Sequence, residues 1–198
     1  MTANSPATLG KTRIAIRAER PGEAGTIADA IRQAYVGVPW SDHREHLMVE
    51  RLRQTAAFVP ALSLVALAGD EIAGHVLLTK AHVRGPEGNA EILALAPLSV
   101  VPGHRGRGIG ARLVREAHRR AAILGFRAVV LVGILRFYDR LGYQPLNRYP
   151  ILLPFEASPE ICRILPLVPD GLRGLSGTVE YAPGWLDHQA DNLIAVIK

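Results

Sequence analysis

Apolar residues at the start of the chain first recur with a period of two and then with the period of a helix. Thr12–Ala18 alternates apolar and polar positions, a pattern typical of a half-buried strand. Pro21–Val36 and His43–Phe58 instead place apolar residues three and four positions apart. The pattern therefore predicts a strand followed by two helices.

A hairpin is predicted next. Ser63–Ala68 and Ile72–Val83 are apolar and bracket Gly69-Asp70, a pair that tolerates the positive backbone angles of a tight turn. Glu91–Val101 is a further long apolar run, interrupted by Pro97, which cannot donate a hydrogen bond to a sheet ladder. We expect an antiparallel pair of strands, followed by a strand with a local break at the proline.

Beyond this strand the pattern changes to a loop rich in glycine and arginine, Gly103–Gly110. A helical stripe follows over Ile109–Leu124. Phe126–Leu131 is a continuous apolar run, consistent with a buried parallel strand, and Arg136–Leu141 is predicted to be a short helix. The order of strand, loop, helix and strand predicts one parallel crossover unit.

Length and composition predict one main domain. The chain has 198 residues, 48% of them hydrophobic, which is enough apolar side chain for a core. We expect a loose tail over residues 1–11, the main domain over 12–160, and an extension over 161–198 packed on the core. Within the extension, the pattern predicts strands at Ile161–Leu167 and Gly177–Tyr181 and an amphipathic end at Asp187–Ile197.

The positive charge is concentrated in one stretch. Lys and Arg number 23 against 18 Asp and Glu, a formal net charge of +5. Residues 105–120 alone contain six arginines and one glutamate, so the rest of the chain is close to neutral. Proteins that grip nucleic acid usually spread their basic residues widely, whereas one compact block beside glycines favours a small polyanion. We therefore expect a phosphate-bearing small molecule as the partner, and not nucleic acid.

Cysteine and hydropathy bear on metal binding and location. Cys162 is the single cysteine, so the chain can form neither an internal disulfide nor a thiolate cluster for zinc. No apolar run approaches the roughly 18 residues that a membrane span needs, and the first residues lack the apolar stretch of a signal peptide. We expect a cytoplasmic protein with no membrane partner.

The glycine-rich loop is the strongest candidate for a binding site. Gly106, Gly108 and Gly110 lie where a strand gives way to a helix, and unpaired amides and the helix dipole there favour an anion. The spacing through Ala111 also fits a dinucleotide fingerprint, so NAD or FAD is an alternative. That fingerprint expects an acidic residue about 20 positions on, and 126–135 contains none. No Lys-Ser or Lys-Thr pair follows the glycines, which argues against a nucleotide P-loop.

Several stretches, in the same order along the chain, resemble one family. RGRGIG at 105–110 is similar to the Arg/Gln-x-x-Gly-x-Gly/Ala motif for the acetyl-CoA pyrophosphate in the GNAT N-acetyltransferase superfamily. LAPLSV at 95–100 and FYDRLGY at 137–143 match the elements on either side of that motif. GLSGTV at 174–179, together with the Gly-His pair ending at His75, is further similar to the YhbS-like subgroup of acyltransferases.

The resemblance implies an acyl-CoA N-acyltransferase of mixed α/β fold. Its central, mostly antiparallel sheet is flanked by helices and splayed between the fourth and fifth strands, and residues 12–160 form the acetyltransferase domain. Acetyl-CoA enters the gap as a co-substrate, and a primary amine on a small molecule or peptide attacks its thioester directly, without a metal. A homodimer is compatible with this family. Two alternatives stay open: a CoA-binding sensor without catalysis, and acetylation of an amine on a protein or a charged tRNA.

The resemblance also implies which residues hold acetyl-CoA. Backbone groups of the strand pair with the pantetheine arm, and amides of the loop hold the pyrophosphate. The residues in question are Leu98, Ser99, Val100, Arg105, Gly106, Arg107, Gly108, Ile109 and Gly110, with Tyr138 beside the thioester.

Two residues are candidates for catalysis. Tyr138 matches the position of the acid that protonates the departing thiolate in many family members, and a phenol pKa of about 10 suits a thiol of about 8.5. Its alternative role is aromatic packing in a short helix. Glu91 is the carboxylate best placed by analogy to act as general base, with a water relay as the alternative. The chain departs from the family at Val132, where an asparagine is common.

Histidines and aromatic residues near the first helices complete the set of candidates. His43 and His46 could share a helix face with Glu50, but without a third histidine nearby a solvated face is favoured over a metal site. Tyr35 and Trp40 bound the segment that lines the acceptor pocket in this family, and core packing is the alternative for both.

Overall fold

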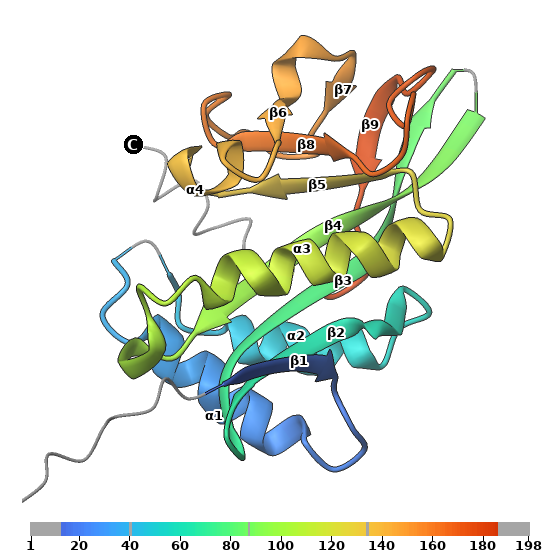
Figure 1. Ribbon diagram of the computed structural model, residues 1–198. Helices are drawn as coiled ribbons and strands as arrows, with labels where there is room; N and C mark the ends of the chain where they lie inside the picture. The colour runs from blue at the N-terminus through green and yellow to red at the C-terminus, as the bar shows by residue number, and fades with distance from the viewer. Residues whose placement is uncertain (1–12, 40, 87, 134, 186–198) are drawn as a thin grey trace, which may run out of the picture.

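Helices cover both faces of one open, mixed sheet (Figure 1). The computed structural model describes residues 13–39, 41–86, 88–133 and 135–185. In chain order its elements are β1 (Ile14–Ala18), α1 (Ala24–Tyr35), α2 (Glu45–Arg53), β2 (Phe58–Ala68), β3 (Glu71–Gly85), β4 (Gly88–Val100), η1 (Pro102–His104), α3 (Ile109–Ile123), β5 (Ala128–Val132), α4 (Leu135–Asp139), β6 (Gln144–Pro145), η2 (Leu146–Arg148), β7 (Ile151–Leu152), β8 (Cys162–Pro166) and β9 (Gly177–Glu180). The main strand order is β1-β2-β3-β4-β5-β8-β6, with β9 paired to β3 and β7. The mixed α/β fold class is confirmed.

The first half of the chain forms the predicted elements. β1 pairs antiparallel with β2, and β2 and β3 form the antiparallel hairpin around Gly69-Asp70. The second helix is shorter than the pattern suggested. It begins at Glu45 because the backbone of His43 has a φ of 60°, outside the helical range. It ends at Arg53, since Phe58 already pairs with Thr79 in the sheet.

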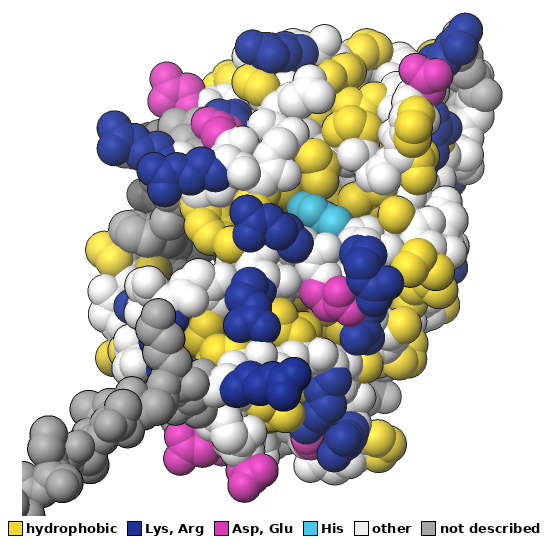
Figure 2. Space-filling model, viewed as in Figure 1, with side chains coloured by type: hydrophobic (Ala, Val, Ile, Leu, Met, Phe, Trp, Pro, Cys, Tyr) yellow, Lys and Arg dark blue, Asp and Glu magenta, His cyan; other side chains and the backbone are white. Residues whose placement is uncertain are grey.

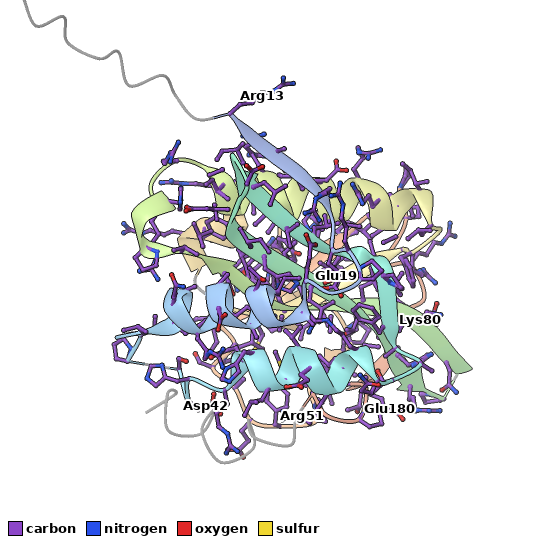
Figure 3. All side chains as sticks on the ribbon, turned by 90° about the horizontal axis from the view of Figure 1, so that it is seen from below. Arg13, Glu19, Asp42, Arg51, Lys80 and Glu180 are labelled. Carbon is purple, nitrogen blue, oxygen red and sulfur yellow. The ribbon has the colours of Figure 1, made fainter. Side chains whose placement is uncertain are left out.

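Each face of the sheet has its own apolar core. Figure 3 shows α1 and α2 on one face and α3 on the other. The core beneath α1 and α2 includes Ile27, Ile31, Met48, Leu52, Leu77 and Ile92. The core beneath α3 includes Leu64, Val76, Leu78, Ile109, Leu113 and Val114. Because neighbouring residues of a strand face opposite sides, β3 sends Leu77 to the first core and Leu78 to the second.

The sheet opens between β4 and β5. The two strands run parallel but pair only at Leu93 with Val129 and at Ala94 with Val130. Beyond this point β4 continues to Val100 along β3, whereas β5 pairs with β8 as far as Val132. The predicted splay between the fourth and fifth strands is therefore confirmed.

The break predicted at Pro97 is a bulge in β4. The register with β3 shifts there, so that Ala96 and Pro97 together lie opposite Leu77. The strand continues on both sides of this bulge. The bulge lies just past the last residue that pairs with β5, which is where β4 turns away from its parallel neighbour.

The C-terminal strands belong to the same sheet. β8 pairs antiparallel with β5 along five residue pairs, and β9 pairs antiparallel with β3. These are the strands predicted at Ile161–Leu167 and Gly177–Tyr181. The predicted tail over residues 1–11 and the predicted amphipathic end at Asp187–Ile197 lie outside the described residues. No helix within the described ranges has the length and apolar character to cross a bilayer.

A cluster of polar side chains, Glu19, Arg53, Ser63 and His75, is enclosed where β2 and β3 meet α2; we call it the His75 cluster. Two guanidinium nitrogens of Arg53 each donate to Glu19 at 3.0 Å, and the Ser63 hydroxyl donates to Glu19 at 2.5 Å. His75 Nε2 lies 3.0 Å from Ser63 Oγ and therefore carries the proton that Ser63 accepts. Burial lowers the pKa of His75 to about 3, so the imidazole is neutral.

Candidate active site

The glycine-rich loop places backbone amides at the start of α3. Gly106 and Gly108 have φ values of 72° and 73°, a left-handed conformation that side chains disfavour. The first helical hydrogen bond at this end runs from the Arg112 amide to the Gly108 carbonyl, at 3.1 Å. The amides of Ile109, Gly110 and Ala111 come before it, so the helix itself supplies no carbonyl for them. The loop therefore has the donors that an anion requires.

The side chains of this loop have separate tasks. The Arg105 guanidinium donates to the Val100 carbonyl at 3.2 Å and also to the Ala34 carbonyl, which ties the ends of β4 and α1 together. Arg107 is exposed and contacts His104. Ile109 is 1% exposed and packs in the core, so only its backbone can face a ligand. Figure 2 shows Lys and Arg side chains gathered on the face that carries α3.

The last residues of β4 present one edge to the splay. The Val101 amide donates to the Ala73 carbonyl of β3, so the alternation of an antiparallel ladder turns the amides and carbonyls of Leu98 and Val100 away from β3. Their carbonyls accept hydrogen bonds from Tyr35 and Arg105, on the side away from β3. This edge therefore meets the geometric requirement for a chain that pairs with β4 as an added strand.

Tyr138 lies in α4, directly after β5. Its ring is 8% exposed and packs edge-on against Phe137 and Tyr143, with centroid distances of 5.0 and 5.4 Å. A Cβ at Gly133 would stand 2.6 Å from this ring, so only glycine permits the approach. Burial raises the pKa of Tyr138 above the ordinary value of 10, which keeps the phenol protonated at neutral pH.

Tyr35, at the end of α1, connects the layer of α1 and α2 to the open edge of β4. Its hydroxyl donates to the Leu98 carbonyl at 3.3 Å. Burial raises the pKa of Tyr35, and the nearby charges of Glu45 and Tyr138 raise it further. Ser99, 1% exposed, is close enough to oppose that rise in part. We call Tyr35, Glu45, Ser99 and Tyr138 the splay cluster, because they meet beside the open edge of β4.

Glu45 is the residue of this cluster that sequence reasoning missed. It is the first residue of α2, and its Oε1 accepts a hydrogen bond from Ser41. Its Oε2 is enclosed and has no hydrogen-bond partner among the described residues. Burial raises the pKa of Glu45, Asp42 adds to the rise, and Ser41 and His43 oppose it. The sequence carries no signal for this role, because Ser41 and Glu45 are four positions apart, one more than the spacing of a capping box, and Arg44 is the N-cap of the helix.

The structure does not bring Glu91 to Tyr138. Glu91 is exposed in the first half of β4, where it pairs with His82 and lies 3.2 Å from Lys80 Nζ. Figure 3 shows Lys80 and Asp42, three residues before Glu45, at opposite ends of the layer that α1 and α2 form. The other candidates divide as follows: His43 and Glu50 are exposed, His46 is half-buried, and Trp40 lies outside the described residues. Over the described ranges, no group of three His, Cys, Asp or Glu side chains is placed to hold a metal.

Comparison with known proteins identifies the family. The sequence profile of the acetyltransferase (GNAT) family matches residues 27–143, more than half of the chain. The chain belongs to this family. It is 31% identical over 122 residues, 60% of its length, to the uncharacterised N-acetyltransferase YjhQ of Escherichia coli K12, and covers 67% of that protein. It is 27% identical over 167 residues to the uncharacterised N-acetyltransferase YhbS of the same strain, covering 84% of this chain and 95% of YhbS.

Solved structures of GNAT proteins share the fold. The crystal structure of Escherichia coli YhbS in complex with CoA superposes with a TM-score of 0.80 at 25% identity, covering 94% of this chain and 97% of that one. A GNAT-family acetyltransferase of Brucella melitensis in complex with acetyl-CoA superposes with a TM-score of 0.72 at 28% identity, covering 88% and 99%. This GNAT protein is therefore an acyltransferase of the YhbS-like subgroup.

Proposed function

We propose that this GNAT protein transfers the acetyl group of acetyl-CoA to a primary amine by direct attack on the thioester. The observation that carries the proposal is that three elements meet at the splay: side chains of Leu98 and Val100 from the open edge of β4 and of Phe137 from α4 all lie within 4 Å of a Cβ built at Gly110, at the amide-lined start of α3. Tyr138 follows Phe137 in α4. The CoA and acetyl-CoA complexes of the two similar structures support the same co-substrate.

Backbone groups, more than side chains, would hold the co-substrate. The pantetheine arm would pair with the backbone of Leu98 and Val100 as an added strand, whereas the backbone of Ser99, between them, faces β3. The pyrophosphate would accept hydrogen bonds from the amides at Gly106–Gly110, strengthened by the dipole of α3. A Cβ at Gly106 or Gly108 would meet no atom within 4 Å, which is consistent with an open cradle over the loop. Arg105 and Arg107 add positive charge to that surface.

The chemistry needs few groups. The lone pair of the amine attacks the carbonyl carbon, and a backbone amide of β4 stabilises the oxyanion. The carbon–sulfur bond then breaks, and the Tyr138 phenol gives its proton to the leaving thiolate. Burial weakens Tyr138 as an acid, but a thiolate released beside it would lose its hydration too and become a stronger base, so the proton transfer stays matched.

The test is a product assay on a panel of amines. Wild-type protein is incubated with acetyl-CoA and 2-phenylethylamine, spermidine or a peptide with one lysine, and acetylated product is measured by mass. Product mass is preferred to thiol titration because Cys162 supplies a thiol of its own. We expect acetylation of at least one amine. Tight binding of CoA in calorimetry, without any acetylated product, would contradict catalysis and favour the sensor alternative.

A further inference from the structure

The splay cluster contains one carboxylate that the chemistry above does not use. Oε1 of Glu45 accepts a hydrogen bond from Ser41, but Oε2 is enclosed without a partner among the described residues. Leaving a carboxylate oxygen enclosed and unpaired is costly, more so than for a neutral group. A donor from a ligand would remove that cost.

Tyr35 shows where this carboxylate lies. Its hydroxyl donates to the Leu98 carbonyl, on the edge of β4 where we place the pantetheine arm. Glu45 and Tyr138 are both near enough to that hydroxyl to raise its pKa. The backbone also joins Glu45 to Tyr35: the Val38 amide donates to the Tyr35 carbonyl, and the Ser41 amide donates to the Val38 carbonyl. The Ser41 hydroxyl in turn donates to Glu45. Glu45 therefore lies at the end of α1 that carries Tyr35, in the layer of α1 and α2, and Tyr138 lies after β5. The thioester would pass between them.

A second enclosed atom supports a ligand at this place. Ser99 is 1% exposed, and its Oγ makes no hydrogen bond of normal geometry with any described residue. It belongs to β4 and faces the Tyr35 phenol, whereas Glu45 belongs to α2, so the two enclosed groups come from different elements. Both are members of the cluster around Tyr35.

The charges around Glu45 leave it uncompensated. The described groups that act on it are the Ser41 hydroxyl, its own backbone amide, Asp42 and His43. Its charge in turn acts on Tyr35 of α1. Among the residues the structure describes, Glu45 makes no ion pair with a lysine or arginine. A cation supplied by the acceptor is the complement that this carboxylate needs.

We propose that Glu45 binds the ammonium group of a cationic primary amine and takes its proton before the amine attacks acetyl-CoA. This inference rests on the proposed function and names the acceptor class for the same site. One proton passes from the ammonium nitrogen to Oε2 of Glu45, which frees the lone pair, and Glu45 later returns the proton to solvent. After attack, the nitrogen loses its second proton to solvent, while the thiolate takes the Tyr138 proton and Tyr138 is reprotonated from solvent.

The test compares Glu45→Gln with Glu50→Gln, an identical change at an exposed position of the same helix. The expected result for Glu45→Gln is CoA affinity within about twofold of wild type, with kcat/KM for the amine lower by about 10²- to 10⁴-fold. The pH profile of wild-type kcat/KM should have an acidic limb with a midpoint above the ordinary glutamate pKa, and Glu45→Gln should lack it. Glu50→Gln should match wild type in all three measurements.

Two further measurements separate a role in catalysis from a role in packing. Because Gln keeps the shape and removes an uncompensated charge, Tm should stay unchanged or rise in Glu45→Gln. The alcohol that matches the best amine should inhibit wild type and Glu45→Gln equally, since it carries no charge. Activity of Glu45→Gln within threefold of wild type, or a fall in Tm with loss of CoA affinity, would overturn this inference alone. If the wild type binds CoA but acetylates no amine of the panel, both the proposed function and this inference are contradicted.

Discussion

Two polar clusters lie within this sheet, and they differ in whether their hydrogen bonds close. In the His75 cluster, Glu19 accepts from both Arg53 and Ser63, and Ser63 accepts from His75. Within the described part of the chain, the enclosed atom of this cluster that lacks a hydrogen-bond partner is His75 Nδ1, which carries a lone pair of a neutral ring. In the splay cluster, a carboxylate oxygen of Glu45 is enclosed without a hydrogen-bond partner among the described residues, and the enclosed hydroxyl of Ser99 faces only the Tyr35 phenol there.

The difference separates groups that serve the fold from groups that serve a reaction. Both clusters are buried and both shift pKa values, so neither burial nor a shifted pKa identifies the site by itself. What distinguishes the splay cluster is that its unpaired atoms lie beside an open strand edge. We therefore expect changes near the splay to cost binding or turnover, and changes in the His75 cluster to cost stability.

The largest effect is expected from Gly108→Glu, at the binding end of the splay. The new carboxylate would stand at the amides of the α3 start, so CoA affinity should fall roughly a hundredfold or more, about 3 kcal/mol. Calorimetric titration with CoA measures it. Gly108→Ala is the control, because it meets the same positive φ without the charge. Equal losses in both variants would show that backbone conformation, and not an anion site, explains the effect.

Tyr138→Phe should lower turnover by about 10²- to 10⁴-fold with little change in the apparent affinity for acetyl-CoA, because only the acidic hydroxyl is removed. Steady-state rates under conditions where chemistry limits turnover measure this. Since burial raises the pKa of Tyr138, the alkaline loss of wild-type activity should lie above the pH of about 10 of a free phenol. A variant within about threefold of wild type would return Tyr138 to a packing role.

Glu19→Gln tests the His75 cluster, where we expect a loss of stability. It removes the charge that holds Arg53, whose side chain is 12% exposed, and so leaves that guanidinium unpaired. Loss of about 3 kcal/mol of unfolding free energy is expected, or about 6–12 °C in Tm. Urea unfolding and calorimetric CoA titration are run together, and CoA affinity should stay within about twofold. A CoA affinity that falls with no change in stability would break the distinction between the two clusters.

The smallest effect is a pH dependence of stability. His118 lies in α3 with its Nε2 2.9 Å from the Tyr143 hydroxyl. Burial lowers the folded-state pKa of His75 to about 3 and that of His118 to about 4, below the unfolded value of 6.5. The unfolded chain therefore binds more protons, and the stability that both histidines contribute above pH 6.5 is lost as pH falls toward their folded values. His75→Gln should reduce the slope of unfolding free energy between about pH 6.5 and 5 by up to about 1.4 kcal/mol per pH unit. An unchanged slope would show that His75 is already charged in the folded protein.

Most of the fold could be predicted from the sequence because its signals are local. The hairpin, the crossover from β4 to β5 and the bulge at Pro97 each follow from periodicity or from a single residue type. The end of α2 could not be predicted, because the pairing of Phe58 with Thr79 decides it. The loop glycines could be predicted because a backbone with positive φ favours glycine, so the residue type itself indicates the loop.

The carboxylate that we propose for catalysis could not be predicted in this way. Glu45 and Ser99 are 54 positions apart, and both act on Tyr35, which joins the layer of α1 and α2 to β4. Glu91 was chosen by analogy along one strand, and that strand carries it toward the hairpin end of the sheet. The sequence likewise predicts that Arg105 binds a ligand, but it does not predict the hydrogen bonds of Arg105 to the carbonyls of Ala34 and Val100.

The width of the splay is set by a strand made late in synthesis. β5 shares two residue pairs with β4 and five with β8, so its position depends more on Cys162–Pro166 than on the strand across the gap. During translation, the loop and the edge of β4 would exist before the far wall of the opening does. We expect affinity for CoA to come last in folding, and a chain cut after Glu160 to lack it, which titration of the truncated protein would test. A truncated chain that binds CoA as tightly as the full chain would show instead that the loop and the edge of β4 are sufficient for binding.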